Sequence, residues 1–259
     1  MRRGWGLVAG LAMTLALANA PARAAVFVNA QIVQAGVDGQ IGGDPIGQSR
    51  DDASTAPRTI AANAAVVETR GDGQGNSVAV RGTSSVNSML SSAERGRVTF
   101  RQSLSVDRNL AGSSMADLSG SIAAAGSYLY LFTTDAAVQF ELNWGVSTSP
   151  TPAGGNDIAQ VAWLRDRNNA DFALYTDALS NGASGTSSTV IGPGSYELRI
   201  QDAAPATADD DTGRVTLGSQ YSFVMSPPPI PEPATWVMMT LGFGLAGGAL
   251  RRARGLARA

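Results

Sequence analysis

The stretch Val138-Gln139-Phe140-Glu141-Leu142-Asn143-Trp144 alternates apolar and polar side chains at every position. Successive side chains of a β-strand point to opposite faces of a sheet, so this pattern predicts a strand with one buried face. The preceding run, Tyr128-Leu129-Tyr130-Leu131-Phe132, is apolar on both faces, which is typical of a central strand. The two runs together indicate β structure in the middle of the chain.

The same alternation recurs on both sides of this region and is broken by turns rich in Gly, Pro, Asn and Asp. Many short strands separated by such turns predict an all-β fold, an antiparallel, jelly-roll-like β-sandwich over residues 56–226. Two Ala-rich stretches, 61–67 and 117–125, are candidates for short helices. The alternating runs are 98–106 (interrupted by Gln102), 196–200 and 221–225, with shorter candidates at 78–80, 161–164 and 172–175.

The composition excludes several classes of chemistry. The 259 residues contain no His and no Cys, and all 19 basic residues are Arg. A Ser-His-Asp triad, a thiolate nucleophile, a disulfide, a His or Cys metal site and a Schiff-base lysine are therefore all excluded. Between residues 25 and 226 the chain carries 20 Asp and Glu against 12 Arg, a net charge of about −8, so nucleic acid is not an expected partner.

The N-terminus has the layout of a secretory signal peptide. Two arginines follow Met1, an apolar run spans 5–17, and small residues then lead to the sequence Ala22-Arg23-Ala24-Ala25. This order of basic, apolar and small-residue regions is read by the export machinery and signal peptidase. Cleavage is predicted after Ala24, because cleavage after Ala20 would leave proline at the first mature position.

The C-terminus predicts a short membrane segment with its tail in the cytoplasm. A proline-rich tether, 227–233, precedes the 17 uncharged residues 234–250. As a helix these would reach about 25 Å, slightly less than a hydrocarbon core of ~30 Å. A cluster of arginines follows, and positive residues stay on the cytoplasmic side. The predicted membrane stop consists of Arg251, Arg252 and Arg254.

Four features of this tail occur in a specific order: the tripeptide Pro231-Glu232-Pro233, Trp236, a Gly-rich apolar span and terminal arginines. In these features the tail resembles the PEP-CTERM sorting signal, which is also called the ice-binding-protein C-terminal domain without implying a role with ice. The resemblance implies recognition by an exosortase, a transpeptidase-like membrane enzyme, and cleavage near Pro231-Glu232-Pro233. It also implies delivery to the cell surface or to an exopolysaccharide matrix.

These predictions divide the chain into successive segments. The protein is expected to be exported by Sec-type machinery, anchored transiently in the inner membrane, and sorted to the cell envelope, outer surface or extracellular matrix. The segments are a signal peptide (1–24), a Gly/Asp-rich N-terminal segment (25–55), the β-sandwich ectodomain (56–226), a Pro-rich tether with the PEP motif (227–233), a single transmembrane sorting helix (234–250) and an Arg-rich cytoplasmic tail (251–259).

No cofactor is expected, and the one candidate metal site is an acidic cluster. Asp209, Asp210 and Asp211 follow Asp202 closely, and carboxylate oxygens at close spacing suit Ca²⁺. Three adjacent aspartates cannot all point one way on a strand, and their spacing does not match an EF-hand loop. A solvated turn between two strands is the simpler interpretation.

Two further groups are candidates for glycan chemistry. Glu141 and Glu197 could form the carboxylate pair of a glycoside hydrolase, although a cross-strand charge partner such as Arg199 explains these polar-face glutamates more simply. Trp144 and Trp163 could stack on sugars, although Trp144 continues an apolar strand face and is expected to pack in the core. A short resemblance of 194–200 to the late strand of carbohydrate-binding or pre-peptidase jelly-roll modules adds to this interpretation.

The sequence therefore favours a non-catalytic surface or matrix protein whose ectodomain binds carbohydrate, exopolysaccharide or another matrix component. A secreted carboxylate-dependent glycan hydrolase and a calcium-stiffened adhesion module remain the two alternatives.

Overall fold

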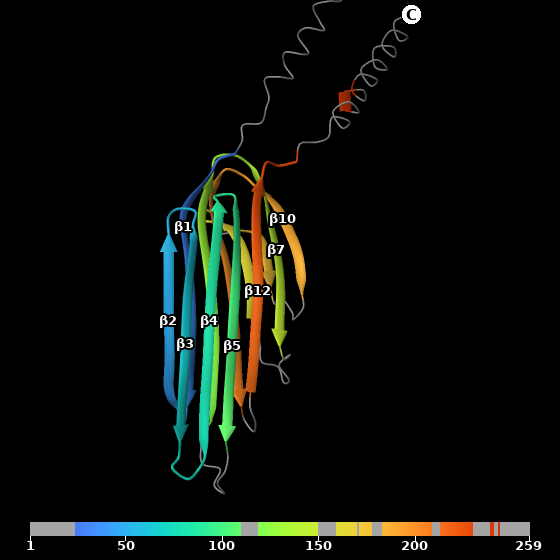
Figure 1. Cartoon of the computed structure of the whole chain (residues 1–259). Coiled ribbons are helices and arrows are strands. Elements are labelled where there is room, and N and C mark those ends of the chain that lie inside the picture. The colour runs from blue at the N-terminus through green and yellow to red at the C-terminus, as the bar shows by residue number, and fades with distance from the viewer. Residues whose placement is uncertain are drawn as a thin grey trace, which may run out of the picture. The chain divides into compact units, whose positions relative to one another are not determined.

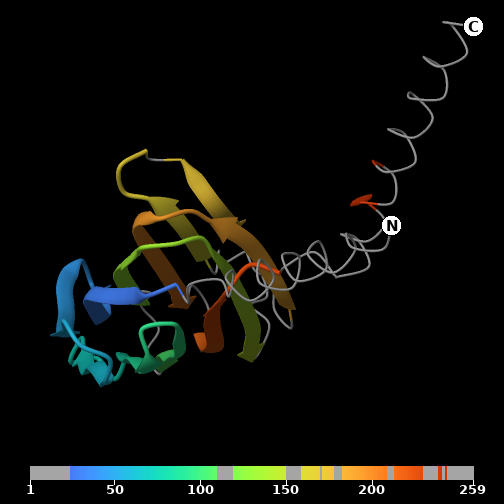
Figure 2. The ribbon, with the colours of Figure 1, turned by 90° about the horizontal axis from the view of Figure 1, so that it is seen from above.

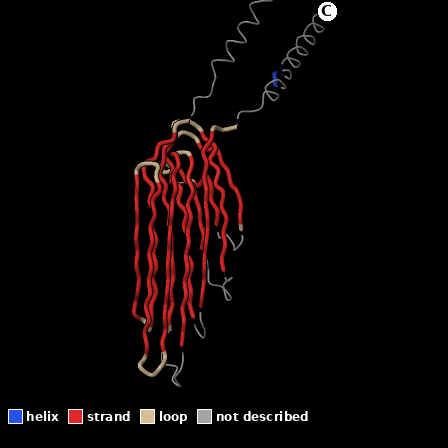
Figure 3. The backbone as a smooth tube through the Cα atoms, viewed as in Figure 1, coloured by secondary structure: helices blue, strands red, loops and turns tan. Residues whose placement is uncertain are grey.

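A computed structural model describes residues 24–109, 119–149, 159–169, 171–177, 183–208 and 213–229, with three further residues at 239, 240 and 243. Within these residues the chain folds into two six-stranded sheets, in which every paired strand is antiparallel. The predicted antiparallel β-sandwich is thereby confirmed (Figure 1). The strands run along one common direction, with the loops gathered at their ends (Figure 3).

The two sheets are named here A and B. Sheet A has, in spatial order, β2 (Asp44–Ser54), β1 (Val26–Ile41), β6 (Gly120–Thr134), β11 (Gly194–Ala208), β8 (Ala159–Asp166) and β9 (Phe172–Asp177). Sheet B has β10 (Ser184–Ile191), β7 (Val138–Ser149), β12 (Gly213–Ser226), β5 (Arg95–Asn109), β4 (Ser77–Ser92) and β3 (Thr59–Gly71).

The predicted division between an N-terminal segment and the sandwich is wrong. Residues 26–54 form β1 and β2, and β1 pairs with β6 over almost its whole length. The Gly and Asp residues of this segment are exposed or half-buried, so they replace no apolar side chain in the core. The two Ala-rich candidates for helices are also strands, in β3 and β6, because alternate alanines such as Ala62 and Ala64 are buried between the sheets.

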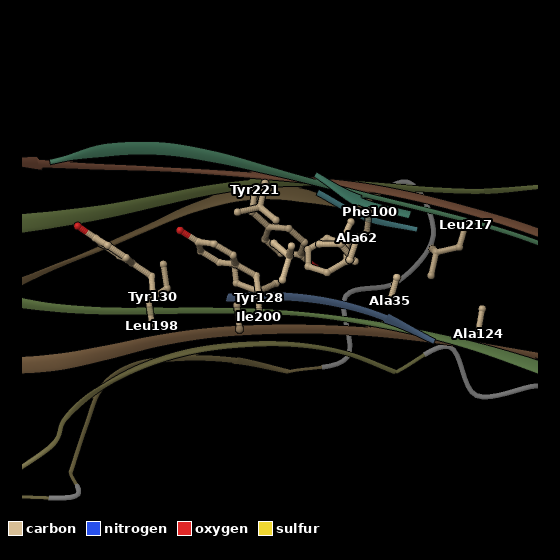
Figure 4. Close-up of a cluster of buried hydrophobic side chains, with 14 of the residues drawn as sticks. Ala35, Ala62, Phe100, Ala124, Tyr128, Tyr130, Leu198, Ile200, Leu217 and Tyr221 are labelled. Carbon is tan, nitrogen blue, oxygen red and sulfur yellow. The ribbon is translucent and has the colours of Figure 1, made fainter. Parts of the chain in front are cut away.

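Aromatic rings fill the sandwich near the end where the chain enters and leaves it. Tyr130 of β6 stacks on Phe223 of β12 with ring centroids 5.2 Å apart, and Phe132 lies 6.4 Å from Phe140 of β7. The Tyr130 hydroxyl donates to the Ala93 carbonyl oxygen at 2.7 Å, which satisfies the polar end of that ring. Figure 4 shows side chains of both sheets meeting in this layer.

Toward the other end the core is aliphatic, and glycines make room for side chains of the facing sheet. A Cβ atom added to Gly82 of β4 would lie 2.5 Å from Val37 Cγ1, and one added to Gly126 of β6 would lie 2.6 Å from Phe100 Cδ1. Ala35 and Ala124 are buried in this part of the core (Figure 4). The inter-sheet layer is therefore aromatic at one end and consists of aliphatic side chains and small residues at the other.

One lateral edge of the sandwich is closed by side chains. The edge strands β2 and β3 lie side by side, as the view along the strands shows (Figure 2). Gln48 Oε1 accepts a hydrogen bond from the Ala65 N–H at 2.8 Å, and Asp52 Oδ2 accepts one from the Ala61 N–H at 3.3 Å. These contacts occupy backbone donors of β3 that an edge strand otherwise leaves open to another chain.

We predict that Phe223→Ala lowers the free energy of unfolding by about 3–5 kcal/mol, because it removes a fully buried ring from the centre of the aromatic layer. Urea unfolding at neutral pH measures the change. The matched control is Val67→Ala, whose side chain is 70% exposed and whose loss is expected to change the free energy by less than about 0.5 kcal/mol. Equal effects of the two substitutions would contradict the assigned core.

Candidate functional site

A groove of about 520 Å³ crosses the outer face of sheet A. It exists because the outward-facing residues of four neighbouring strands are small at one level of the sheet: Gly36 of β1, Ala125 of β6, Ala203 of β11 and Ala159 of β8. The small side chains make the surface lower at this level, and the longer side chains around them form the margins of the groove. The polar margin is formed by Gln34, Ser49, Arg50, Asp51, Ser127 and Gln201.

An aromatic surface adjoins this groove. Trp163 follows Val161, a groove residue of β8, by two positions, so it faces the same side of the sheet. Tyr175 of β9 is the cross-strand neighbour of Trp163, and its ring centroid lies 5.6 Å from that of Phe172. Tyr175 is 55% exposed and Phe172 is 58% exposed. We call Trp163, Tyr175 and Phe172 the aromatic shoulder.

Charged side chains connect the shoulder to the groove. Glu197 of β11 is buried on this outer face, and its carboxylate pairs with Arg165 Nη2 at 3.1 Å and with Arg199 Nη2 at 3.2 Å. The Arg199 guanidinium lies over the Trp163 ring, 5.5 Å from its centroid, as a cation–π pair. The two arginines neutralise Glu197 and leave this group with one net positive charge.

A buried polar cluster lies beneath the groove floor. Asp202 of β11 points inward and accepts hydrogen bonds from the hydroxyls of Ser219 and Tyr221, the latter at 2.9 Å. Gln102 Nε2 of β5 donates to the Asp202 carbonyl oxygen at 3.0 Å, so the cluster joins the two sheets. Burial raises the pKa of Asp202 to about 6, although the hydrogen bonds from Ser219 and Tyr221 act in the opposite direction.

The structure separates the two glutamates that sequence analysis considered as a catalytic pair. Glu141 lies on the outer face of sheet B, where it accepts a hydrogen bond from Asn143 Nδ2 at 2.9 Å. Glu197 lies on the outer face of sheet A, so the whole sandwich stands between the two carboxylates. Glu197 does pair with Arg199, but Arg199 lies on the same strand, and Arg165 of β8 is the cross-strand partner.

The two tryptophans have different environments. Trp144 packs against the core, with its ring lying across Gly185 of β10, as its place on an apolar strand face predicts. Trp163 faces outward with Arg199 instead. Only Trp163 is therefore placed where it can contribute to a surface.

Asp202 is not part of a solvated acidic turn, because β11 continues to Ala208 and buries it. The proposed calcium ligands Asp209, Asp210 and Asp211 lie outside the described residues. Among the residues that the structure does describe, no three acidic side chains gather in a way that could hold a metal ion.

Sequence reasoning missed the buried cluster, although one signal for it was present. Gln102 interrupts the apolar face of its strand, and Asp202 and Ser219 occupy inward positions in theirs. Each of these residues, taken alone, looks like a break in the alternating pattern of its own strand. Only the packing of β5 and β12 against β11 brings the three together.

Residues 229–254 match the sequence profile of the PEP-CTERM protein-sorting motif. This confirms the resemblance that the tail shows in its tripeptide, tryptophan, apolar span and arginines. Three groups of predicted residues lie outside the described part of the chain. They are Ala22 of the signal-cleavage sequence, the sorting motif Pro231, Glu232, Pro233 and Trp236, and the membrane stop Arg251, Arg252 and Arg254. Within the described part, no helix has both the length and the apolar character needed to cross a membrane.

No curated protein matches the chain. Among solved structures, a GH31 alpha-xylosidase from Xanthomonas citri is similar over 73% of this chain, with 6% identity and a TM-score of 0.20. The similar region is 38% of that enzyme's length. Carbohydrate-binding modules from the β-sandwich superfamily are similar over 77% of this chain and 97% of theirs, with 9% identity and a TM-score of 0.18. At these TM-scores neither likeness supports an inference.

We predict that Asp202→Asn changes stability in a pH-dependent way. The pKa of Asp202 is raised in the folded state from its ordinary value of 3.8 to about 6. Between these two pH values the folded protein therefore keeps a proton on Asp202 that the unfolded chain has released. Stability from this group is therefore present at low pH and is lost as pH rises through about 6, by about 3 kcal/mol. Asn cannot titrate, so the variant should lack this dependence.

Urea unfolding of the wild type and the variant at pH 4 and pH 7 measures the effect. Relative to the wild type, the variant is expected to be more stable at pH 7 than at pH 4. A difference between the two proteins that is the same at both pH values would show that the carboxyl group of Asp202 does not titrate in this range.

Proposed function

We propose that this chain is an exported cell-surface or extracellular-matrix protein that an exosortase recognises and cleaves through its C-terminal motif. In this proposal the sandwich is a non-catalytic module that binds carbohydrate or another component of an exopolysaccharide matrix. The observation that carries the proposal is the match of residues 229–254 to the sorting motif, directly after the last strand ends at Ser226.

The ends of the sandwich fit removal of both terminal segments. The first strand begins at Val26, one residue after the predicted mature N-terminus at Ala25. The last strand ends at Ser226, before the Pro-rich tether, and one compact unit ends at Pro227. Cleavage after Ala24 and near Pro231-Glu232-Pro233 would therefore leave all twelve strands intact.

The start of the first strand and the end of the last strand also lie close together, at one end of the sandwich. Ala24, Val26, Ser226 and Pro227 line one hollow, and the Asp135 N–H donates to the Ala25 carbonyl oxygen at this end of the sheet. A signal peptide before Ala25 and a sorting segment after Pro229 would thus attach at one end of the strands.

The non-catalytic part of the proposal rests on the arrangement of carboxylates. Glycosidases use two carboxyl groups about 5–10 Å apart across one cleft. Glu141 and Glu197 lie on opposite outer faces, and Glu197 is held by two arginines. Asp202 points into the core, where hydroxyl groups of β12 surround it.

We predict that the mature protein, isolated from its native envelope, has the mass of a chain that begins at Ala25 and ends between Pro231 and Pro233, with or without an added group. Intact-mass spectrometry tests both cleavage sites at once. A mass that includes the residues through Ala259 would mean a single-pass anchor and would remove the exosortase from the proposal.

We also predict that replacing Arg251, Arg252 and Arg254 with glutamine weakens retention at the inner membrane, because the positive stop on the cytoplasmic side is lost. Cell fractionation and immunoblotting of the precursor measure the change. Arg214→Gln, at an exposed position of β12, is the control and should leave location and processing as they are. Unchanged processing in the triple variant would contradict the assigned role of the tail.

A further inference from the structure

We infer that the outer face of sheet A binds one uncharged polysaccharide chain, laid through the groove and onto the aromatic shoulder. This inference rests on the proposed role of the ectodomain as a carbohydrate- or matrix-binding module, and it names the site and the class of ligand. The groove spans β2, β1, β6, β11 and β8, and the shoulder extends the surface to the edge strand β9.

The register of the strands makes the groove and the shoulder one continuous surface. Moving two residues along β11 leads from Gln201, in the groove, to Arg199. The same step along β8 leads from Val161 to Trp163, and Arg199 and Trp163 are direct cross-strand neighbours. Five strands at a spacing of about 4.8 Å give a width of about 20 Å, which accommodates several sugar units.

The exposed rings of the shoulder suit a sugar face. Aromatic side chains are normally buried, and Tyr175 and Phe172 each expose more than half of their surface at neighbouring positions. A pyranose ring presents a flat patch of C–H groups on one face, which packs on an aromatic ring, and hydroxyl groups at its edge. Trp163 is held in place beside these rings by the Arg199 guanidinium.

The polar groups around the rings suit hydroxyl groups. Gln34 and Gln201 place amide groups at the groove margin, and each amide both donates and accepts hydrogen bonds. Arg165 and Arg199 are 40% and 37% exposed, and each guanidinium carries five N–H donors. Arg165 donates from Nη2 to Glu197, and Arg199 forms an ion pair with it, so other N–H groups of both arginines face outward. The surface therefore offers donors and acceptors beside apolar rings.

The charges favour an uncharged ligand. Asp51 at the groove margin balances the single positive charge that the group of Arg165, Arg199 and Glu197 retains. The side chain of Arg50 adds no charge to this face, because Arg50 lies opposite the buried Ala35 and points to the other side of the sheet. The ectodomain as a whole carries about −8, which opposes the approach of a polyanion. A polyuronate or nucleic acid would need a stronger positive surface than this.

The outer face of sheet B provides a contrast. It also has a hollow, of about 440 Å³, but the lining consists mainly of hydroxyl side chains and Arg101 and includes no aromatic ring. A hydroxyl-lined surface gains little by exchanging water for sugar hydroxyls, since one hydrogen bond replaces another. The exposed aromatic rings thus distinguish sheet A.

Affinity electrophoresis in native gels tests the inference on the mature chain, with barley β-glucan, xylan, galactomannan or alginate in the gel. We expect at least one of the three uncharged polysaccharides to retard the wild type. Tyr175→Ala should weaken that retardation about tenfold, which is typical of the loss of a central aromatic contact. Ala125→Phe should weaken it too, because an outward-facing ring would fill the groove while the shoulder stays intact.

Phe27→Ala is the matched control. Phe27 is 56% exposed, nearly the same as Phe172, but on β1 it lies seven residues before Gln34, which corresponds to about 23 Å from the first groove residue of that strand. Its loss should leave retardation unchanged. Thermal unfolding of each variant shows whether the fold is retained, and the exposure of the replaced side chains predicts that it is.

Four results would overturn the inference. The first is that no uncharged polysaccharide retards the wild type, and the second is that alginate alone retards it. The third is equal retardation of the wild type and both site variants. The fourth is a wild-type dimer in light scattering that Tyr175→Ala dissociates. The last would identify the shoulder as an interface between copies. None of them alters the mass of the mature protein, so the sorting proposal stands or fails separately.

Discussion

The stacking of aromatic rings between the two sheets is the interaction on which the rest of the structure depends. Tyr130 and Phe132 of β6 meet Phe223 of β12 and Phe140 of β7, so the central strands of sheet A are fixed against those of sheet B. The chain has neither disulfides nor, in its described part, a candidate metal cluster that could supply such a link. Packing of apolar surface is therefore the main source of stability.

The same strands that build the core also shape the candidate site. On β6 the inward residues change from rings to Gly126 and Ala124, and the outward residue between them is Ala125. The stretch of β6 with small inward residues thus also carries the small outward residue that helps to form the groove. The polar cluster of Asp202, Ser219 and Gln102 lies between the two, which places a titratable carboxyl group directly beneath the groove.

The position of the chain ends links the fold to the proposed sorting. The predicted signal peptide and sorting segment lie outside the twelve strands, so their removal breaks no strand pairing. Both segments join the sandwich at the same end, because β1 starts where β12 ends. The aromatic shoulder lies on β8 and the edge strand β9, away from the β2–β3 edge that Gln48 and Asp52 close. The two edges of the sandwich therefore differ in the surface that they offer to a partner.

The sequence by itself determined the strand pattern, the two-sheet class and the sorting motif, because a two-residue period and a short ordered motif are local properties of a chain. Local pattern failed where it was weak: the Ala-rich parts of β3 and β6 suggested helices, and β1 and β2 were separated from the sandwich. Only the tertiary structure decided that Glu141 and Glu197 face apart, that Asp202 is buried with Ser219 and Gln102, and that Trp163 joins Tyr175 beside a groove. These are contacts between residues far apart in sequence, and they follow from the order of the strands in each sheet, which the alternation along a single strand does not specify.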